Sequence, residues 1–511
     1  MIVTLDPPAS VADRPATPLG AVRDWVTPAL ALLGAAAAFV VGFVDLGKRD
    51  LWNDEFATWH GATLSAHQAR MFIGNIDLVH GFYYLLVRGW MVFAGDSPAG
   101  LRFLSLLAVS ATAALIVVLG GRLFDRAVGA VAALVYVALP VTSRYAQEAR
   151  SYALVTCGAV LATWLLLRAL ERPARRHWWL YGASIVAVGW LHFVALLVLA
   201  GHLFYVWRTA GGPDRRWQWT TVTGTSTLFV LPLLVLASGQ SGQISWIKGD
   251  WTAVRKVFAE LVGGVPMLAV VVLFLLLGAA LAAQRRPAVF MLVIWAVLPP
   301  VFGYATFTLL HLFMARYFLF TVPAVALLVA FGAVHSGRLV ARPVATAAGL
   351  AVGLAVVAGL AFAGLPAQRT IRTSTLEGQP SYVAATRYIA EHAQPGDGVA
   401  FNDGFGGPTD LARKATDYQF RNQSAATRPR DVFLAQAARD RGWLTALECA
   451  DQVTCLGDTQ RVWLIETGHI GNQFEGLPPS RANLLQSAFT VKHLERFEKV
   501  RVVELVRKSP H

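Results

Sequence analysis

Residues Phe103–Gly121 read FLSLLAVSATAALIVVLGG and contain no charged side chain. A helix needs about 20 mainly apolar residues to cross the hydrocarbon core of a bilayer. Similar runs occur on both sides of this segment, so the sequence predicts an α-helical polytopic membrane protein with about eleven transmembrane helices. The other runs lie at residues 25–44, 127–143, 151–167, 178–207 (two short spans interrupted at His192), 219–247, 261–284, 287–310, 317–334 and 343–368.

The overall composition supports a membrane protein. Hydrophobic residues make up 55% of the chain and charged residues only 15%, against about 25% in soluble domains. The net charge is +13, which would also suit a nucleic-acid-binding protein. Such a protein needs its basic residues gathered on a soluble face, whereas here they form short clusters between apolar runs. We therefore expect membrane lipids as partners and no nucleic acid.

The positions of the arginines predict the topology. Short cytoplasmic loops carry an excess of Lys and Arg. If the polar N-terminus, residues 1–24, is cytoplasmic, every short Arg cluster falls inside, provided that residues 81–95 do not cross the membrane. That segment is short, has Arg88 at its middle, and is predicted to be an interfacial helix. The outer face then holds the first loop, residues 45–100, the loops 144–150 and 239–260, and the C-terminal tail.

The tail differs in character from the membrane domain, which we place at residues 25–368. Residues 369–511 predict a small, soluble, extracytoplasmic α/β domain. We expect helices at 381–392 and 431–441, and strands that begin at 398, 461 and 500. Cys449 and Cys455 lie close together in this tail, and the outer compartment permits a disulfide between them. A metal-binding pair is the weaker alternative.

The first outer loop carries an acidic pair, Asp54–Glu55, flanked by aromatic residues. A carboxylate at the outer face could accept a proton from a sugar or protein hydroxyl, so both residues are candidate catalytic groups. The pair also fits a helix N-terminus, with Asn53 or Asp54 as the cap and Glu55 favoured by the helix dipole.

Other charged and aromatic residues are predicted at the same membrane face. The second outer loop contains Arg144, Glu148 and Arg150, for which headgroup binding and substrate binding are both open interpretations. Acids and bases at one level, next to apolar helices, predict a polar site for a substrate with a lipid tail. The candidate substrate-binding residues are Asp77, His80, Arg102, Arg144, Glu148, Arg150, His192, Arg316 and Tyr317.

At these residues the chain resembles the GT-C superfamily of polyprenyl-phosphate-sugar-dependent glycosyltransferases. It is most similar to the branch that contains protein O-mannosyltransferases and lipid A aminoarabinose transferases, glycosyltransferase family 39. The resemblance covers about residues 25–334, and one departure is Gly81-Phe82, where the family often has prolines. It rests on four blocks. The first is Trp52-x-Asp54-Glu55-x-Ala57, and the second is Asp77-x-x-His80-x-x-Tyr83-Tyr84-Leu85-Leu86 with Gly95-Asp96-Ser97 and Leu101-Arg102-Phe103-x-Ser105. The third runs from Pro140 through Tyr145-Ala146-Gln147-Glu148-Ala149-Arg150-Ser151-Tyr152, and the fourth is Arg316-Tyr317 with Pro323.

The resemblance implies an inverting membrane glycosyltransferase of the cell membrane. Its donor would be a mannose-like hexose or a pentose on a polyprenyl phosphate, and its acceptor a lipid, glycan or protein at the outer face. Asp54 would be the general base, with Glu55 as its support or as the base itself, and Arg102, Arg150 and Arg316 would bind phosphate. A divalent metal stays open as a cofactor, with Asp54, Glu148 and His80 as candidate ligands. The alternative function is a transporter or flippase of lipid-linked sugars.

Overall fold

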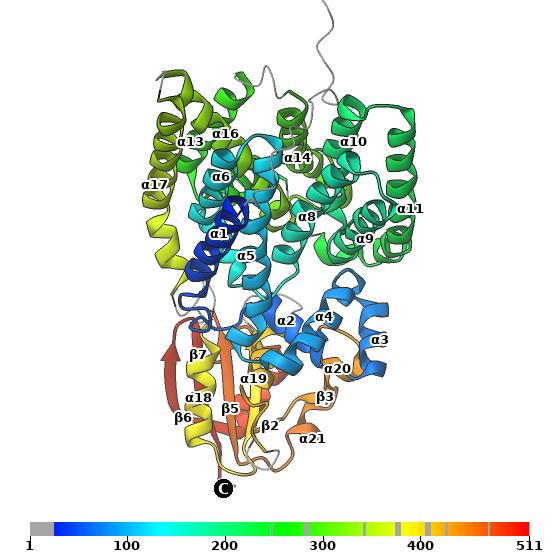
Figure 1. Cartoon of the computed structure of the whole chain (residues 1–511). Helices are drawn as coiled ribbons and strands as arrows, with labels where there is room; N and C mark the ends of the chain where they lie inside the picture. The colour runs from blue at the N-terminus through cyan, green and yellow to red at the C-terminus, as the bar shows by residue number, and fades with distance from the viewer. Residues whose placement is uncertain are drawn as a thin grey trace, which may run out of the picture.

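The computed structural model describes residues 25–245, 247, 249–280, 286–340, 344–373, 380–403, 410–424, 428–468 and 471–509. The predicted cytoplasmic segment 1–24 lies outside these residues. The chain forms a bundle of long helices and a separate C-terminal domain, with three shorter helices between them (Figure 1). These three helices come from the first outer loop and are α2 (Asn53–Thr63), α3 (Ala66–Asn75) and α4 (Leu78–Ala94).

The described residues hold seven helices that are long and apolar enough to span a membrane, or up to nine if each of two bent pairs is one span. Six of the seven are α1 (Val26–Phe43), α5 (Pro98–Leu123), α8 (Tyr152–Glu171), α11 (Pro213–Ser238), α14 (Arg286–Ala305) and α17 (Ala345–Ile371). The seventh joins η3 (Ala315–Thr321) to α16 (Val322–Val340). The bent pairs are α6 (Arg126–Ala138) with α7 (Pro140–Ala146), and α12 (Trp251–Val262) with α13 (Val265–Ala280).

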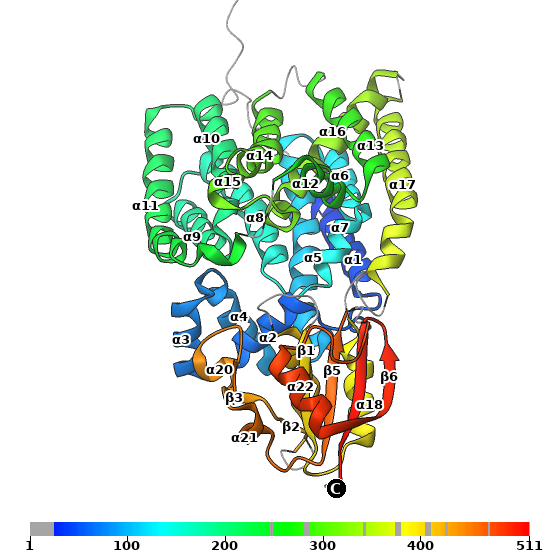
Figure 2. The same ribbon diagram turned by 180° about the vertical axis from the view of Figure 1, so that it is seen from behind.

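Two shorter helices complete the bundle on the side of α11 (Figure 2). They are α9 (Arg175–Leu191) and α10 (Val198–Thr209), joined by η1 (Phe193–Leu197). Short elements also connect the longer helices, namely η2 (Ser241–Ile244) and α15 (Phe307–Leu310). The break at His192 that divides the predicted run 178–207 is therefore the point where α9 ends.

Small residues let the helices approach closely. A Cβ atom on Gly120 of α5 would lie 2.6 Å from the Cα atom of Gly129 in α6. Glycine is thus required where these two helices cross, as is typical of helix packing in membranes. Outward-facing side chains such as Leu32, Val235 and Phe362 are exposed, as expected for surfaces that contact lipid.

Arginine ion pairs join the loops at one end of the bundle. Arg122 lies 2.9 Å from Glu171, and Arg338 lies 2.6 Å from Asp125. Helix α5 begins beside the C-terminal domain and is 26 residues long. At 1.5 Å per residue, Arg122 is therefore roughly 35 Å from that end of the helix. The Arg clusters and the C-terminal domain thus occupy opposite ends of the bundle.

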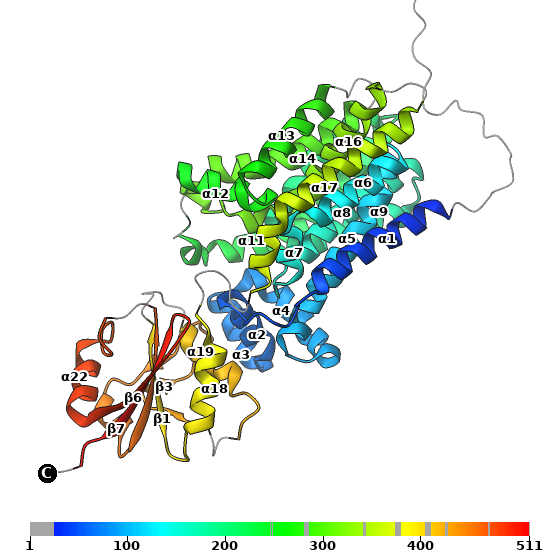
Figure 3. The same ribbon diagram turned by 90° about the vertical axis from the view of Figure 1, so that its left-hand side faces the viewer.

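The C-terminal domain is built on a five-stranded sheet of order β2-β1-β5-β7-β6. Strands β2 (Arg430–Asp431), β1 (Gly398–Asp403) and β5 (Arg461–Thr467) are parallel, whereas β7 (Val500–Arg507) is antiparallel to β5 and to β6 (Phe489–Phe497). Helix α22 (Pro479–Ala488) covers one face, and α18 (Tyr382–His392) and α19 (Leu411–Gln419) cover the other (Figure 3).

The helix predicted at residues 431–441 is wrong. Asp431 ends β2. Strand β3 (Leu434–Gln436) pairs with β4 (Leu447–Glu448), and the short helix α20 (Ala438–Arg441) lies between these two strands. Long-range pairing with β1 and burial of Val432 and Phe433 outweigh the local helical pattern. A further short helix, α21 (Gln452–Leu456), leads into β5, and the disulfide predicted between Cys449 and Cys455 is present.

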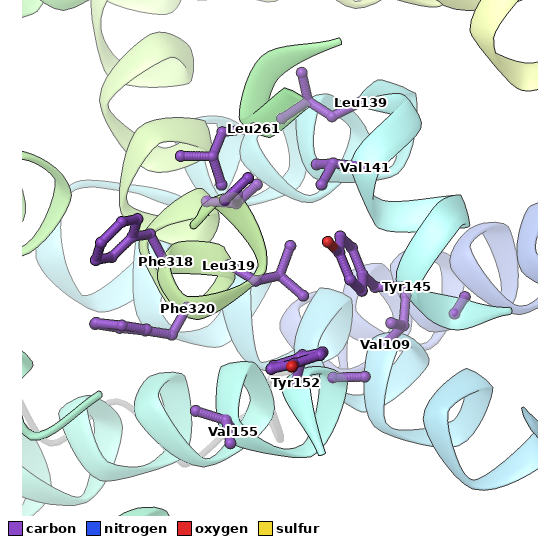
Figure 4. Close-up of a cluster of buried hydrophobic side chains, with 14 of the residues drawn as sticks. Val109, Leu139, Val141, Tyr145, Tyr152, Val155, Leu261, Phe318, Leu319 and Phe320 are labelled. Atoms are coloured by element: carbon purple, nitrogen blue, oxygen red, sulfur yellow. The ribbon is translucent and has the colours of Figure 1, made fainter. Parts of the chain in front are cut away.

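Buried side chains of α5, α7, α8, α12 and η3 pack together inside the bundle (Figure 4). Tyr145 of α7 and Tyr152 of α8 meet edge to face, with ring centroids 5.8 Å apart. Leu319 of η3 points toward both rings, and Val109 of α5 lies beside them. This core fixes the loop 147–151 and the start of η3 relative to one another.

Candidate active site

Helix α2 carries the acidic pair in its first turn. Trp52 is the N-cap residue, and the Glu55 side chain accepts a hydrogen bond from the Trp52 backbone amide at 3.4 Å. The predicted cap residues Asn53 and Asp54 are therefore wrong, whereas Glu55 lies in the first turn as expected and satisfies the Trp52 amide. The Asp54 side chain does not bond to the helix N-terminus and instead lies near Arg150 and Arg316.

Glu55 is fully buried and pairs with Arg102 of α5. Arg102 Nε lies 2.8 Å from Glu55 Oε1, and Nη2 lies 2.7 Å from Oε2. The remaining Arg102 N–H groups donate to the backbone carbonyls of Leu46, Arg49 and Asp50. A guanidinium has five N–H donors, and all five are used. The expectation that Arg102 binds a phosphate is therefore wrong.

The hydrogen-bonding capacity of the Glu55 carboxylate is also fully used, since its Oε1 atom accepts the Ala149 backbone amide at 2.9 Å in addition to the bonds from Arg102. Burial is the largest influence and raises the pKa of Glu55, but Arg102, Arg49 and the Ala149 amide together lower the pKa to below its usual value, so this carboxylate stays ionised inside its pair. Such a carboxylate has no free lone pair directed at a substrate. Glu55 holds the two outer loops together and is poorly placed to be the base.

Asp54 has a contrasting environment. Its Oδ2 atom is buried without a hydrogen-bond partner among the described residues. Arg316 Nη1 lies 3.4 Å from it and Arg150 Nε lies 3.9 Å from it. Burial raises the pKa of Asp54, but the two guanidinium groups lower the pKa to below its usual range. Asp54 is thus an ionised carboxylate with a free lone pair beside two cations.

A chain of polar contacts fixes Arg150. Its Nη2 lies 2.9 Å from His80 Nε2, and His80 Nδ1 lies 2.6 Å from Asp77 Oδ1. Because arginine only donates, His80 Nε2 must accept, and Nδ1 then carries the proton that bonds to Asp77. The Tyr84 hydroxyl bonds to the other oxygen of Asp77. Helix α4 thereby holds Arg150 against Asp54.

A second acid lies nearby. Glu148 is 1% exposed and pairs with Arg144, and burial raises the pKa of Glu148 above its usual range. The Trp52 ring lies between two guanidinium groups, 5.6 Å from that of Arg144 and 5.8 Å from that of Arg316. Cation–π contacts of this kind hold arginines in place without using their N–H donors. Both arginines therefore keep donors for an anionic ligand.

Two cavities open beside these residues. One of about 820 Å³, which we call the polar cavity, has charged side chains as well as apolar ones in its lining; the charged residues are Arg144, Glu148, Lys256, Glu260 and Arg316. The other is about 430 Å³ and mainly apolar, with His80, His192 and Tyr317 at its polar end. Arg316 and Tyr317 are adjacent in η3. Arg316 lines the polar cavity, and Tyr317 lines the smaller, apolar one. The apolar walls come from Ile76, Val79, Phe193, Leu234, Ala237, Ile244, Leu309, Leu310 and Leu312.

His192 packs between aromatic rings at the mouth of the apolar cavity. Its ring centroid lies 4.9 Å from that of Tyr317 and 5.8 Å from that of Tyr152. Burial lowers the pKa of His192 to about 3, so the imidazole is neutral. Its Nδ1 atom has no hydrogen-bond partner among the described residues.

Comparison with known proteins agrees with this architecture. Residues 81–236 match the family model described as dolichyl-phosphate-mannose-protein mannosyltransferase. The fold matches that of apo ArnT from Cupriavidus metallidurans with a TM-score of 0.58, covering 93% of this chain and 98% of that chain at 15% identity. ArnT bound to undecaprenyl phosphate matches with a TM-score of 0.52 and 14% identity over the same shares.

The chain therefore has the fold of the GT-C glycosyltransferases, and its residues 81–236 match a mannosyltransferase family. Comparison of the sequence with curated proteins finds no match.

The three candidate metal ligands, Asp54, Glu148 and His80, contact separate partners in the structure. Among the described residues, no three His, Cys, Asp or Glu side chains gather as a metal-binding group. His80 uses both ring nitrogens, and Glu148 pairs with Arg144. The predicted ligand set Asp54, Glu148 and His80 therefore does not come together. The cations beside Asp54 are arginines.

Some residues of the candidate site were not predicted from the sequence. Arg49 is 1% exposed and donates to the Gln147 carbonyl at 2.5 Å, which links the two outer loops. Trp52, Tyr84 and Tyr152 each contact or neighbour a predicted residue. Trp52 and Tyr84 belong to the sequence blocks that carry the family resemblance, so their motifs already contained this signal.

Proposed function

We propose that this glycosyltransferase moves a sugar from a polyprenyl-phosphate carrier to a hydroxyl group of an acceptor at the outer membrane face. The observation that carries the proposal is Asp54 Oδ2, which is buried without a hydrogen bond between Arg316 and Arg150. A general base needs a free lone pair, and a departing phosphate needs cations. Asp54 and the two arginines supply both within a few ångströms.

The reaction needs one carboxylate. Asp54 takes the proton from the acceptor hydroxyl, whose oxygen attacks the anomeric carbon from the side opposite the phosphate. The bond from that carbon to the phosphate oxygen breaks, and its electron pair leaves with the polyprenyl phosphate. Because a phosphate is a good leaving group, no second carboxyl group is needed as an acid, unlike in glycosidases. The configuration at the anomeric carbon inverts.

The two cavities suit different substrates. The apolar cavity has room for the first isoprenoid units, and its polar end, with His80, His192 and Tyr317, lies near Arg150. The polar cavity, with Lys256, Glu260 and Glu148, suits a hydroxylated acceptor. ArnT has been captured with undecaprenyl phosphate, a carrier of the same chemical class. The sugar, hexose or pentose, and the acceptor, lipid, glycan or protein, are to be determined by assay.

Transfer is favoured over transport by the position of the charges. Transporters place ionisable groups at mid-membrane, whereas Asp54, Asp77, Glu148 and Arg150 lie in the loops at one end of the bundle. The Arg clusters at the other end support a cytoplasmic N-terminus and an extracytoplasmic C-terminal domain. A tag placed after Gly95 is expected to be accessible from outside.

The test is sugar transfer by membranes supplied with a panel of radiolabelled polyprenyl-phosphate sugars. Asp54→Asn is expected to reduce transfer by about 10²- to 10⁴-fold, because general-base catalysis is lost. The matched control is Asp45→Asn in the same loop, where the carboxylate is 40% exposed and pairs with Lys48. Full activity of Asp54→Asn would refute the proposed base.

A further inference from the structure

Asp96, in the connection between α4 and α5, receives hydrogen bonds from both parts of the protein. Trp59 of α2 donates its indole N–H to Asp96 Oδ2 at 3.3 Å. Arg421, which follows α19 in the C-terminal domain, donates Nε to the same oxygen at 2.6 Å and Nη2 to Oδ1 at 3.2 Å. The Tyr418 hydroxyl donates to the Asp96 carbonyl at 2.9 Å. One acidic residue therefore links α2 to the C-terminal domain.

Aromatic packing strengthens the same contact. The Tyr418 ring meets Trp59 edge to face with centroids 5.2 Å apart, and meets Phe56 at 5.8 Å. All three side chains are at most 5% exposed. The Arg421 guanidinium lies over the Tyr418 ring at 3.9 Å. Edge-to-face pairs and a stacked cation each contribute on the order of 1 kcal/mol, so this contact is a specific one.

The contact holds the helix that carries the proposed base. Helix α2 has 11 residues, and helices this short do not form stably on their own. Its position depends on its neighbours. Glu55 fixes one side of it to α5, and Phe56 and Trp59 fix another side to the C-terminal domain. Asp54, which faces Arg316 and Arg150, lies in the first turn of the same helix, directly before Glu55 and Phe56.

We infer that the C-terminal domain is part of the transferase machinery, and that Tyr418 and Arg421 are positioning residues for Asp54 that act through Asp96, Trp59 and Phe56. They do not touch either cavity that we assign to a substrate. The inference rests on the proposed role of Asp54. In this role the C-terminal domain affects the rate of sugar transfer by holding α2 in place, independently of whether its own surface binds the acceptor.

The test compares purified full-length variants in the transfer assay, with kcat, the KM for the donor and the melting temperature measured for each. Tyr418→Ala combined with Arg421→Gln is expected to lower kcat at least 10-fold while the donor KM changes less than twofold. Tyr418→Phe keeps the ring contacts and is expected to retain at least a third of the wild-type kcat. The matched control is Arg428→Gln, which removes an exposed ion pair with Asp417 inside the C-terminal domain.

Two results would overturn the inference. One is a wild-type kcat in the double variant. The other is a loss in Tyr418→Phe as large as in the double variant, together with a lowered melting temperature, because that pattern indicates general destabilisation. If wild-type protein transfers sugar from none of the donors, the proposed function fails. If the wild type is active and the double variant is equally active, only the inference fails.

Discussion

Arg102 donates two N–H groups to the Glu55 carboxylate at 2.8 and 2.7 Å, and both side chains are fully buried. The two residues are 47 positions apart and join α5 to the first turn of α2. Glu55 also accepts the amide of Ala149 from the second outer loop. The pair is therefore a structural link that places Asp54, and it explains why two adjacent carboxylates have different roles.

Breaking this pair is expected to destabilise the protein. Arg102→Met leaves the Glu55 charge buried and unpaired, which typically costs about 3–5 kcal/mol. The matched control is Arg122→Met, which removes an ion pair whose partners are 28% and 53% exposed and which should change stability by less than about 1 kcal/mol. Thermal unfolding of the purified protein measures both. Equal effects of the two substitutions would contradict the structural role of the pair.

The pH dependence of transfer follows from the lowered pKa of Asp54. A base works only when ionised, so activity falls as the pH drops through its pKa. Since that pKa lies below the usual value of about 3.9, wild-type kcat/KM should show no acid limb due to Asp54 between about pH 5 and 8. Arg316→Gln removes the nearest cation, which should raise the pKa of Asp54 and move the acid limb toward higher pH.

Arg255→Gln is the control for this pH profile, since Arg255 is an exposed arginine on α12. Its acid limb should coincide with that of the wild type. An Arg316→Gln enzyme with reduced activity but an unshifted acid limb would mean that the titrating base is another group, and Glu148 would then be the next residue to test.

Metal removal is expected to have little effect. Arg316 and Arg150 already place positive charge beside Asp54, and both nitrogens of His80 are occupied. Transfer by EDTA-treated protein should stay within about twofold of the untreated rate, since a guanidinium can stabilise the departing phosphate. Loss of activity that one divalent metal restores would show that a metal completes the site.

The sequence predicted the membrane bundle and the position of the site better than it predicted individual partners. Apolar run length and Arg clustering are local properties, and they placed Asp54, Glu148 and His192 at one face. The partners of Arg102 could not be predicted in this way, because its contacts with Glu55 and three backbone carbonyls come from segments about 50 residues away. A buried arginine looks the same in sequence whether it binds a phosphate or a carboxylate.

In the C-terminal domain, too, local strand patterns were predicted correctly but long-range contacts were not. The strands at 398, 461 and 500 were predicted because each is a short apolar run. Residues 431–441 were assigned to a helix from their spacing, yet their structure depends on pairing with β1 and on the ion pair from Arg413 to Asp431. The contact of Tyr418 with α2 was equally beyond prediction, since its two sides lie more than 300 residues apart.

The two cavities are assigned to different substrates, so substitutions in each should affect the KM of only one of them. Lys256 of α12 lines the polar cavity and is remote in sequence from the proposed catalytic groups. Lys256→Gln should raise the KM for the acceptor several-fold with the donor KM unchanged. Leu234 of α11 lines the apolar cavity. Leu234→Trp adds a large side chain to that space and should raise the donor KM several-fold with the acceptor KM unchanged.

Each of these two variants is the control for the other, because both leave Asp54 and its arginines intact. The kinetic constants come from varying one substrate at a saturating level of the other. Opposite effects, with Lys256→Gln acting on the donor KM and Leu234→Trp on the acceptor KM, would mean that the polar cavity binds the donor and the apolar cavity the acceptor. An unchanged KM for both substrates in Leu234→Trp would mean that the isoprenoid chain runs outside the apolar cavity, along the lipid-facing surface of the bundle.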